Sequence, residues 1–357
     1  MKIALLSYST KPRGGVVHTL ALAEALAALG ENVTVWTLGR GGDEGFYRRV
    51  DPAVRLRIVP FPDGPGGETV GERILRSIAT LRDAFDPAPY DVVHAQDCIS
   101  ANAVGRCVRT VHHLDHFTTP ELAACHEKAI VEPYAHICVS RSVAEELKEG
   151  WGLTAEVIPN GVAYERFATT DPAARAQWRS RLGRYVLTVG GIEPRKGSLD
   201  LLEAYARLEG GVGLVIAGGE TLFDYRDYRA RWETRAAELG VEPVVLGPVA
   251  DDELPALVGA AAAFAFPSLK EGFGLAAMEA LAAGVPLVVR DLPVLREVFG
   301  SAARFADTPD TFAAELGHAM ATEDPLRRTA GRQLAARHTW DAAARRHLAL
   351  YKTLPGH

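Results

Sequence analysis

Short apolar runs alternate with helix-like segments along the whole chain, and this alternation constrains the fold more than any other feature. The apolar runs predict buried strands, and the segments between them carry apolar residues at helical spacing. Predicted strands of the first half cover residues 3–6, 32–38, 56–59, 91–94, 109–112, 135–140 and 156–158. This order of elements is typical of a parallel sheet that is covered by helices on both faces.

The same alternation starts again in the second half of the chain. Predicted strands there cover residues 185–189, 214–217, 244–246, 263–266 and 286–289, and the stretch from 310 onward is predicted to be helical. A turn signal, Pro159-Asn160-Gly161-Val162, separates the halves. We therefore predict an α/β protein with two doubly wound Rossmann-like domains that face each other across a cleft. These domains would cover 1–168 and 169–339, and a helix at 340–357 would pack back on the first.

Charge and composition narrow the range of partners. The 357 residues include 45 acidic and 39 basic side chains, a net charge of −6, so nucleic acid is not an expected partner. A small anion could still bind in a locally basic cleft. The chain start lacks a signal-peptide core and no apolar run is long enough to cross a bilayer, so a cytoplasmic protein is expected. Cys98, Cys107, Cys125 and Cys138 match no zinc or redox spacing and are expected to be free thiols.

Common phosphate-binding loops are absent from the sequence. The segment 7–15 after the first predicted strand has no GxGxxG pattern, and in 190–197 the lysine precedes the glycine, unlike a Walker loop. Three predicted helix starts nevertheless contain glycine: Gly14-Gly15, Lys196-Gly197 and Lys270 to Leu275. Their exposed backbone amides could together hold a diphosphate, although a glycine-rich turn of this kind, taken alone, more often has a structural role.

Two glutamates in the last of these helix starts are unusual. Glu279 lies in an otherwise apolar segment, eight residues after Glu271. Burying a carboxylate there is costly unless it has polar partners. Glu279 is therefore either a salt-bridged or cleft-edge residue, or an acceptor of hydrogen bonds from a ribose, with Glu271 reaching a different hydroxylated group.

The segments Glu271-Gly272-Phe273-Gly274 and 279–286 resemble the E-x7-E signature of family 4 (group 1) glycosyltransferases, retaining enzymes with the GT-B fold. Gly14-Gly15, Pro159 to Val162 and Glu193 to Gly197 follow the order of that family, so the resemblance covers nearly the whole chain. It implies transfer of a sugar, most simply a hexose, from a nucleoside-diphosphate sugar to an acceptor hydroxyl. The acceptor would be a small molecule, a glycan or a lipid. An epimerase or hydrolase of nucleotide sugars on the same scaffold remains the alternative.

The resemblance also implies roles for individual residues. Glu279 would bind the ribose of the donor and Glu271 the hydroxyls of its sugar, while Lys196 would neutralise the departing diphosphate. His112 would line the acceptor side near the anomeric carbon. Backbone groups that contact the donor would come from Gly15, Phe273, Gly274 and Leu275.

One departure from the family pattern concerns the phosphate site. Gly191 stands where the family often has arginine, and Arg195 is the candidate replacement. No DxD motif follows a predicted strand, and Asp251-Asp252 is interpreted as a helix N-cap. We therefore expect no metal and no cofactor beyond the donor substrate. A front-face displacement, with a diphosphate oxygen as the base, is the preferred mechanism.

Two further hypotheses concern binding rather than catalysis. A two-lobed solute-binding protein would normally be exported, and the missing signal peptide weighs against it. The predicted helix 68–85 carries Arg73, Arg76 and Arg82, which could contact anionic lipid. Acidic residues alternate with these arginines, so a solvated helix face is the favoured interpretation.

Overall fold

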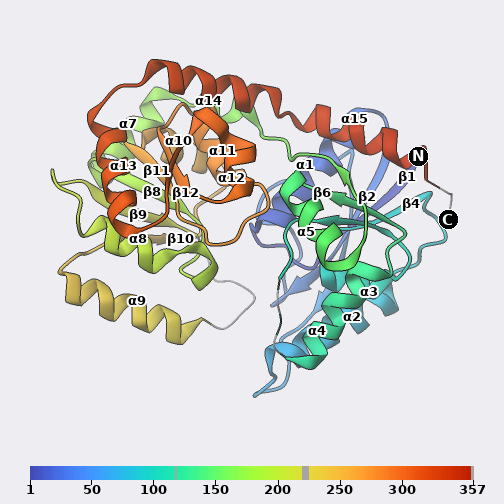
Figure 1. Cartoon of the computed structure of the whole chain (residues 1–357). Coiled ribbons are helices and arrows are strands. Elements are labelled where there is room, and N and C mark those ends of the chain that lie inside the picture. The colour runs from blue at the N-terminus through green and yellow to red at the C-terminus, as the bar shows by residue number, and fades with distance from the viewer. Residues whose placement is uncertain (116, 118, 219–224, 355–357) are drawn as a thin grey trace. The chain divides into compact units, whose positions relative to one another are not determined.

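The computed structural model describes residues 1–115, 117, 119–218 and 225–354, and the chain forms two compact units (Figure 1). The first unit contains Met1–Gly161 and the C-terminal segment from Trp340, and the second contains Val162–Thr339. The boundary between the units therefore lies after residue 161, seven residues before the predicted one. Helix α6 (Tyr164–Ala168) packs against α10 (Leu254–Ala260) and α11 (Leu275–Ala282), which assigns it to the second unit.

The first unit is built on a seven-stranded parallel sheet with the order β3-β2-β1-β4-β5-β6-β7. Its strands are β1 (Lys2–Leu6), β2 (Asn32–Arg40), β3 (Arg55–Phe61), β4 (Val92–Ala95), β5 (Val108–Val111), β6 (Ala135–Cys138) and β7 (Glu156–Val157). Each strand predicted for this half is present. The order reverses between β1 and β4, and in doubly wound sheets ligands bind beyond the carboxyl ends of the strands at that point.

Helices cover the first sheet, and the chain terminus supplies one of them (Figure 1). The helices are α1 (Gly14–Ala28), α2 (Val70–Ala84), α3 (Cys98–Val104), α4 (Pro120–Val131), α5 (Arg141–Trp151) and α15 (Trp340–Tyr351). Helix α15 packs against α1, and Leu348 and Tyr351 join a core that includes Leu20 and Leu26. The C-terminal helix is therefore part of the first unit and ends at Tyr351.

The second unit has a six-stranded parallel sheet with the order β10-β9-β8-β11-β12-β13. Its strands are β8 (Tyr185–Val189), β9 (Gly213–Ala217), β10 (Val244–Gly247), β11 (Ala263–Phe266), β12 (Leu287–Arg290) and β13 (Arg304–Ala306). The sequence did not predict β13, because this edge strand has only three residues and begins with an arginine. The order reverses between β8 and β11, so both units carry the same topological switch point.

Helices alternate with the strands along most of the second unit. They are α6, α7 (Pro172–Leu182), α8 (Ser198–Tyr205), α9 (Arg226–Leu239), α10, α11, α12 (Pro293–Phe299), α13 (Pro309–Ala321) and α14 (Pro325–Arg337). A short 3-10 turn, Pro194–Lys196, precedes α8. Cys98, Cys107, Cys125 and Cys138 are all free. None of the helices in the described part of the chain is long and apolar enough to cross a membrane.

Candidate active site

The turn after β8 requires glycine at two positions. Gly190 has φ +149° and Gly197 has φ +63°, backbone conformations that disfavour residues with a side chain. A Cβ at Gly197 would also lie 2.2 Å from the carbonyl oxygen of Pro267, in the loop that follows β11. The two loops at the switch point of the second sheet are therefore in direct backbone contact.

Lys196 and Arg195 end this turn and both contact the first glutamate of the E-x7-E pattern. The Lys196 ammonium lies 2.9 Å from Glu271 Oε2, and Arg195 Nη1 lies 3.6 Å from the same oxygen. The methylenes of Lys196 lie over Gly190, where a Cβ would be 3.6 Å away. Arg195 also pairs with Glu193 at 3.4 Å. The structure thus brings three of the predicted site residues together and directs both cations to one carboxylate.

A small cavity beside Lys196 contains a polar atom without a partner. Its lining includes Gly190, Gly191, Lys196 and Ser268. Ser268 is 1% exposed, and its hydroxyl has no hydrogen-bond partner among the described residues. Buried hydroxyls are normally paired, so an unpaired one marks a place where a ligand or water completes the structure. Ser268 was not predicted, because serine after a strand is common in turns of every kind.

The loop from Pro267 to Gly274 leads into α11. Gly274 has φ +94° and is the N-cap of this helix, and no side chain caps the first turn. Phe273 is 3% exposed, and its ring lies 5.7 Å from the His338 ring. The phenyl group is therefore unavailable to a ligand. Phe273, Gly274 and Leu275 can act only through their backbone groups at a helix N-terminus, which is favourable for an anion.

Glu279 lies one turn into α11 and has an unusual acidity. Burial, assisted by the charge of Asp251 and opposed by that of Arg166, raises the pKa of this carboxyl to about 7. Arg166 and Asp251 pair with each other at 2.9 Å. Glu279 consequently has no close cationic partner of its own among the described residues, which excludes a simple salt bridge as the reason for its place in an apolar helix.

The pair Asp251-Asp252 is not the helix N-cap that the sequence suggested. Glu253 precedes α10 as its N-cap, without a side-chain bond to the helix. Asp251 instead holds Arg166 of α6, whose guanidinium also donates to the Asp251 carbonyl. A long-range ion pair has taken the place of a local cap.

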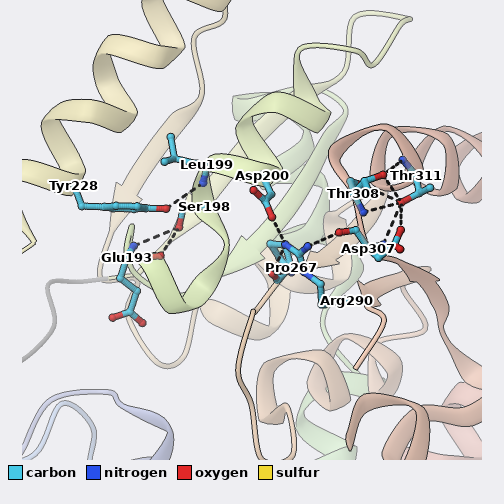
Figure 2. A network of polar contacts seen from close by, with 10 residues as sticks. All are labelled: Glu193, Ser198, Leu199, Asp200, Tyr228, Pro267, Arg290, Asp307, Thr308 and Thr311. Atoms are coloured by element: carbon cyan, nitrogen blue, oxygen red, sulfur yellow. Dashed lines mark hydrogen bonds and ion pairs between the residues drawn. The ribbon is translucent and has the colours of Figure 1, made fainter. Parts of the chain in front are cut away.

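Arg290 at the end of β12 binds to the loop after β11, to the loop after β13 and to α8 (Figure 2). It is 6% exposed, and its Nε and Nη2 each donate to the Pro267 carbonyl at 3.1 Å. Nη1 donates to the Asp307 carbonyl at 2.6 Å, and Nη2 also pairs with Asp200 in the first turn of α8. Arg290 therefore fixes the loop after β11 relative to α8. Sequence analysis missed it, although a charged residue at the carboxyl end of an apolar strand is a usable signal.

A second group of bonds fixes the start of α8 (Figure 2). The Ser198 hydroxyl accepts from the Glu193 amide and donates to the Glu193 carbonyl, at 3.3 and 3.4 Å. The Leu199 amide donates to the Tyr228 hydroxyl of α9 at 3.3 Å. These bonds close the turn that carries Arg195 and Lys196, so both cations are held by a rigid backbone.

In the first unit, Gly15 and His112 lie next to each other. Gly14 and Gly15 are the first two residues of α1, not the residues before it. A Cβ at Gly15 would lie 3.8 Å from the His112 ring, which follows directly after β5. Burial, together with the nearby charge of Arg109, holds the pKa of His112 well below its usual range. His112 is therefore neutral at physiological pH, and its buried Nε2 has no hydrogen-bond partner in the described part of the chain.

A row of buried imidazoles extends from His112 into the unit. The His18 ring of α1 lies 4.8 Å from His112 and 6.2 Å from His347 of α15, and His347 lies 5.8 Å from His94. His18 Nδ1 lies 2.9 Å from Asn160 Oδ1, which can only accept, so His18 presents an unprotonated Nε2. Burial lowers the pKa of His18 as well. Helices from the two ends of the chain thus support the His112 ring.

The arginines of α2 contact their own unit. Arg76 forms a two-bond ion pair with Glu68, and Arg82 donates to the Asn102 carbonyl at 2.9 Å. Arg76 and Arg82 therefore both have partners within the first unit. Among the described residues, no group of three or more His, Cys, Asp and Glu side chains is arranged to hold a metal ion.

Comparison with known families matches each half of the chain to one model. Residues 12–166 match the model "Glycosyltransferase Family 4", and residues 172–335 match "Glycosyl transferases group 1". The chain is 29% identical to the MMP alpha-(1->4)-mannosyltransferase of Mycolicibacterium hassiacum, across 99% of this chain and 98% of that protein. It is equally 29% identical to the phosphatidyl-myo-inositol mannosyltransferase of Mycobacterium tuberculosis, across 100% of this chain and 98% of that protein.

Solved structures share the fold at lower identity. Anabaena HepE, in complex with UDP and glucose, has a TM-score of 0.75 and 20% identity and covers 99% of this chain and 100% of its own. Sucrose-phosphate synthase from Thermosynechococcus elongatus has a TM-score of 0.81 and 21% identity over 98% of both chains. Two Rossmann-like units and these neighbours define the GT-B fold. From both family models and the full-length mannosyltransferase relatives, the chain belongs to the group 1 (family 4) glycosyltransferases and is a glycosyltransferase enzyme.

Proposed function

We propose that this enzyme moves a sugar from a nucleoside-diphosphate sugar to an acceptor hydroxyl with retention of configuration. The observation that carries the proposal is the arrangement of Lys196, Glu271 and Glu279 around the start of α11 in the second unit. Named relatives act as mannosyltransferases, and one structural neighbour holds UDP and glucose. They support a sugar-nucleotide donor, and the retaining outcome rests on the resemblance of the E-x7-E motif.

Donor binding is assigned to the second unit. The uncapped N-terminus of α11 and the cations Lys196 and Arg195 suit a diphosphate, which gains from positive charge and backbone amides. Glu279 suits a ribose, since two hydroxyls can donate to one carboxylate. Backbone groups of Phe273, Gly274 and Leu275 would contact the phosphate and sugar.

The ion pair between Lys196 and Glu271 suggests how the site responds to its donor. In the unliganded protein the ammonium neutralises Glu271 at 2.9 Å. A diphosphate carries more negative charge than one carboxylate and would draw Lys196 toward itself. Glu271 would then be able to accept hydrogen bonds from sugar hydroxyls. One exchange of partners would thus prepare both residues for the donor.

Acceptor binding is assigned to the first unit, with His112 at its centre, while the backbone of the neighbouring Gly15 would contact the donor. A neutral imidazole with an unpaired Nε2 can exchange a hydrogen bond with a hydroxyl without adding charge. The row of His18, His347 and His94 holds the ring in place. Positioning of this kind lowers the barrier by fixing the reacting groups before reaction.

The chemical step follows from where charge develops. The bond between the anomeric carbon and the diphosphate oxygen breaks, and the acceptor oxygen forms its new bond on the same face. The acceptor proton passes to the departing diphosphate oxygen, so no protein carboxylate needs to act as nucleophile. Lys196 and Arg195 stabilise the leaving diphosphate. We propose that neither a divalent ion nor a cofactor takes part.

Thermal denaturation with a panel of nucleotide sugars tests the donor site. We expect one nucleotide to raise the unfolding temperature of the wild type and to lose most of this effect in Glu279→Ala, because binding to the folded state stabilises it. Glu209→Ala, at an exposed position of the same unit, is the matched control and should respond like the wild type. A wild type that responds to no nucleotide more than Glu279→Ala does would refute the assignment.

Rates measured with and without an acceptor distinguish transfer from the alternative reactions. With the donor that stabilises best, we expect sugar release without an acceptor to be much slower than transfer to an added alcohol. Release at the full rate without acceptor would favour a hydrolase. The anomeric configuration of the product, followed by NMR, tests retention.

A further inference from the structure

Two arginines flank one tyrosine at the switch point of the first sheet. Tyr8 follows β1, and the guanidinium carbons of Arg13 and Arg40 each lie 5.6 Å from the centre of its ring. Arg13 Nη1 donates to the Tyr8 hydroxyl at 2.8 Å, and Arg40 Nε donates to the Tyr8 carbonyl at 3.0 Å. Arg40 Nη2 donates to the Ser77 hydroxyl at 2.8 Å. The guanidinium carbon of Arg40 also lies 4.8 Å from the centre of the Phe61 ring. The tyrosine thus holds two positive charges close together.

These two charges have no carboxylate of their own in the part of the chain that the structure describes. Within the described ranges, neither Arg13 nor Arg40 forms an ion pair with an acidic side chain. Asp97 is the nearest candidate, but its oxygens accept from the Tyr8 amide, the Ser100 amide and the Ser100 hydroxyl. Burial also raises the pKa of Asp97, which weakens it as a counter-charge. Glu68, the other nearby acid, is held in its ion pair with Arg76.

Arg40 of this pair has a shifted pKa. Burial and the charges of Arg13 and Arg73 lower its pKa to about 10, against the opposing effects of Tyr8 and Asp97. Like charges gathered in a partly buried place are unfavourable without an anion. In a chain with a net charge of −6, such a local excess of positive charge stands out.

The pair also lies beside the predicted reaction centre of the first unit. Arg13 is the N-cap of α1, two residues before Gly15, which contacts His112. Gln96, between β4 and Asp97, is 1% exposed, and both polar atoms of its amide lack partners in the described part of the chain. A buried amide with no partner indicates that something polar is still to bind nearby.

We propose that Arg13 and Arg40 bind an anionic group, a phosphate or a carboxylate, carried by the acceptor. The inference rests on the proposed function, because it takes the first unit to be the acceptor side. Among the described residues, the Arg13 side chain donates one hydrogen bond, to Tyr8, so its other donors are available for the two-bond contact that guanidinium makes with such anions. The second unit has its own cations for the donor, Lys196 and Arg195, so the donor diphosphate does not need this pair.

Hydrogen exchange followed by mass spectrometry tests the site with inorganic phosphate as the probe and chloride at equal ionic strength as the reference. In the absence of nucleotide, we expect phosphate to slow exchange in peptides that span residues 8–15. Arg13→Gln should weaken the apparent phosphate affinity of this segment at least about tenfold, a loss of about 1.4 kcal/mol. Arg13→Lys should restore part of it, since it keeps the charge.

Matched variants separate a local site from a general charge effect. Arg49→Gln, exposed in the same unit, removes one positive charge elsewhere and should leave the protection unchanged. Arg40→Lys keeps the charge of the more buried member and should bind phosphate less tightly than the wild type. Unchanged unfolding temperatures of these variants would show that the fold is intact.

Three results would overturn the inference. Exchange in residues 8–15 that ignores phosphate, or protection that persists in Arg13→Gln, would show that no anion binds there through these arginines. Protection of 8–15 by a nucleoside diphosphate that is lost in Arg13→Gln would assign the pair to the donor instead. Failure of the proposed function has a different signature, since it would remove the nucleotide response of the second unit.

Discussion

The two units share one strand order but place opposite chemistry at the carboxyl ends of their strands. The first unit holds neutral imidazoles and two arginines that form no ion pair with any acidic side chain of the described residues. The second unit holds two cations that are already paired with a carboxylate, and one carboxyl that burial makes a weak acid. Sheet topology therefore fixes where a ligand is bound, and the loop residues decide which ligand it is.

The difference also concerns how each site is prepared. In the first unit, the cations and imidazoles are held in place by Tyr8 and by packing of α1 against α15. In the second unit, Lys196 and Glu271 are paired with each other at 2.9 Å, and under the proposed function a donor would compete for this pair. Under the proposed function, the first site is therefore preorganised, while the second would exchange partners on binding a donor.

The largest effect is expected at Lys196. Lys196→Ala removes the cation closest to Glu271 and, with it, charge stabilisation of the departing diphosphate, so kcat should fall by about 10²–10³-fold. Steady-state rates with saturating donor would measure this loss. Arg337→Ala, an exposed residue of α14, is the control and should keep the full rate. A Lys196→Ala enzyme that retains kcat and changes only the donor KM would assign Lys196 to binding alone.

His112 should show a smaller effect of a different kind. His112→Ala removes a positioned neutral group from the first unit, so kcat should fall by about 10–10²-fold, as for other positioning or proton-handling groups. Nucleotide affinity, measured by thermal shift, should not change, because the side chains proposed to bind the donor are in the second unit. Because the pKa of His112 is already low, the wild-type rate should show no His112-dependent decrease from pH 8 to pH 6.

The neighbouring histidine provides the control for this prediction. His113 is paired with Asp115 at 3.2 Å and is partly exposed, and His113→Ala should leave kcat nearly unchanged. Equal losses in both variants would indicate a general disturbance of the loop after β5.

The features that the sequence predicted are those that depend on residues close together in the chain. Apolar periodicity predicted the strands of both sheets except β13, and glycine at positions such as Gly274 marked turns that require positive φ. The pair Glu271 and Glu279 was visible because a charge in an apolar segment is costly wherever that segment packs.

Long-range contacts account for what the sequence did not predict. Arg290 contacts Pro267 and Asp200, which are distant in the chain, and His18 contacts His347 across most of the sequence. No local pattern specifies such pairs, since they depend on how strands are ordered in the sheet. Asp251 illustrates the same limit, because a local cap and a distant ion pair leave the same sequence signature.

The smallest predicted effect is a pH dependence of donor binding in the second unit. Glu279 has a pKa of about 7 in the free protein, and a ribose that donates to its carboxylate favours the deprotonated form. Affinity should therefore rise as the pH increases through 7, by about tenfold between pH 6 and pH 8, or about 1.4 kcal/mol. A nucleoside-diphosphate sugar is the suitable probe for calorimetry, because it has no terminal phosphate that titrates in this range. Glu279→Gln, whose amide does not titrate, should bind more weakly at pH 8 and show a flat profile. A wild type with the same flat profile would mean that Glu279 does not contact the donor, and would leave the two units with less contrasting sites.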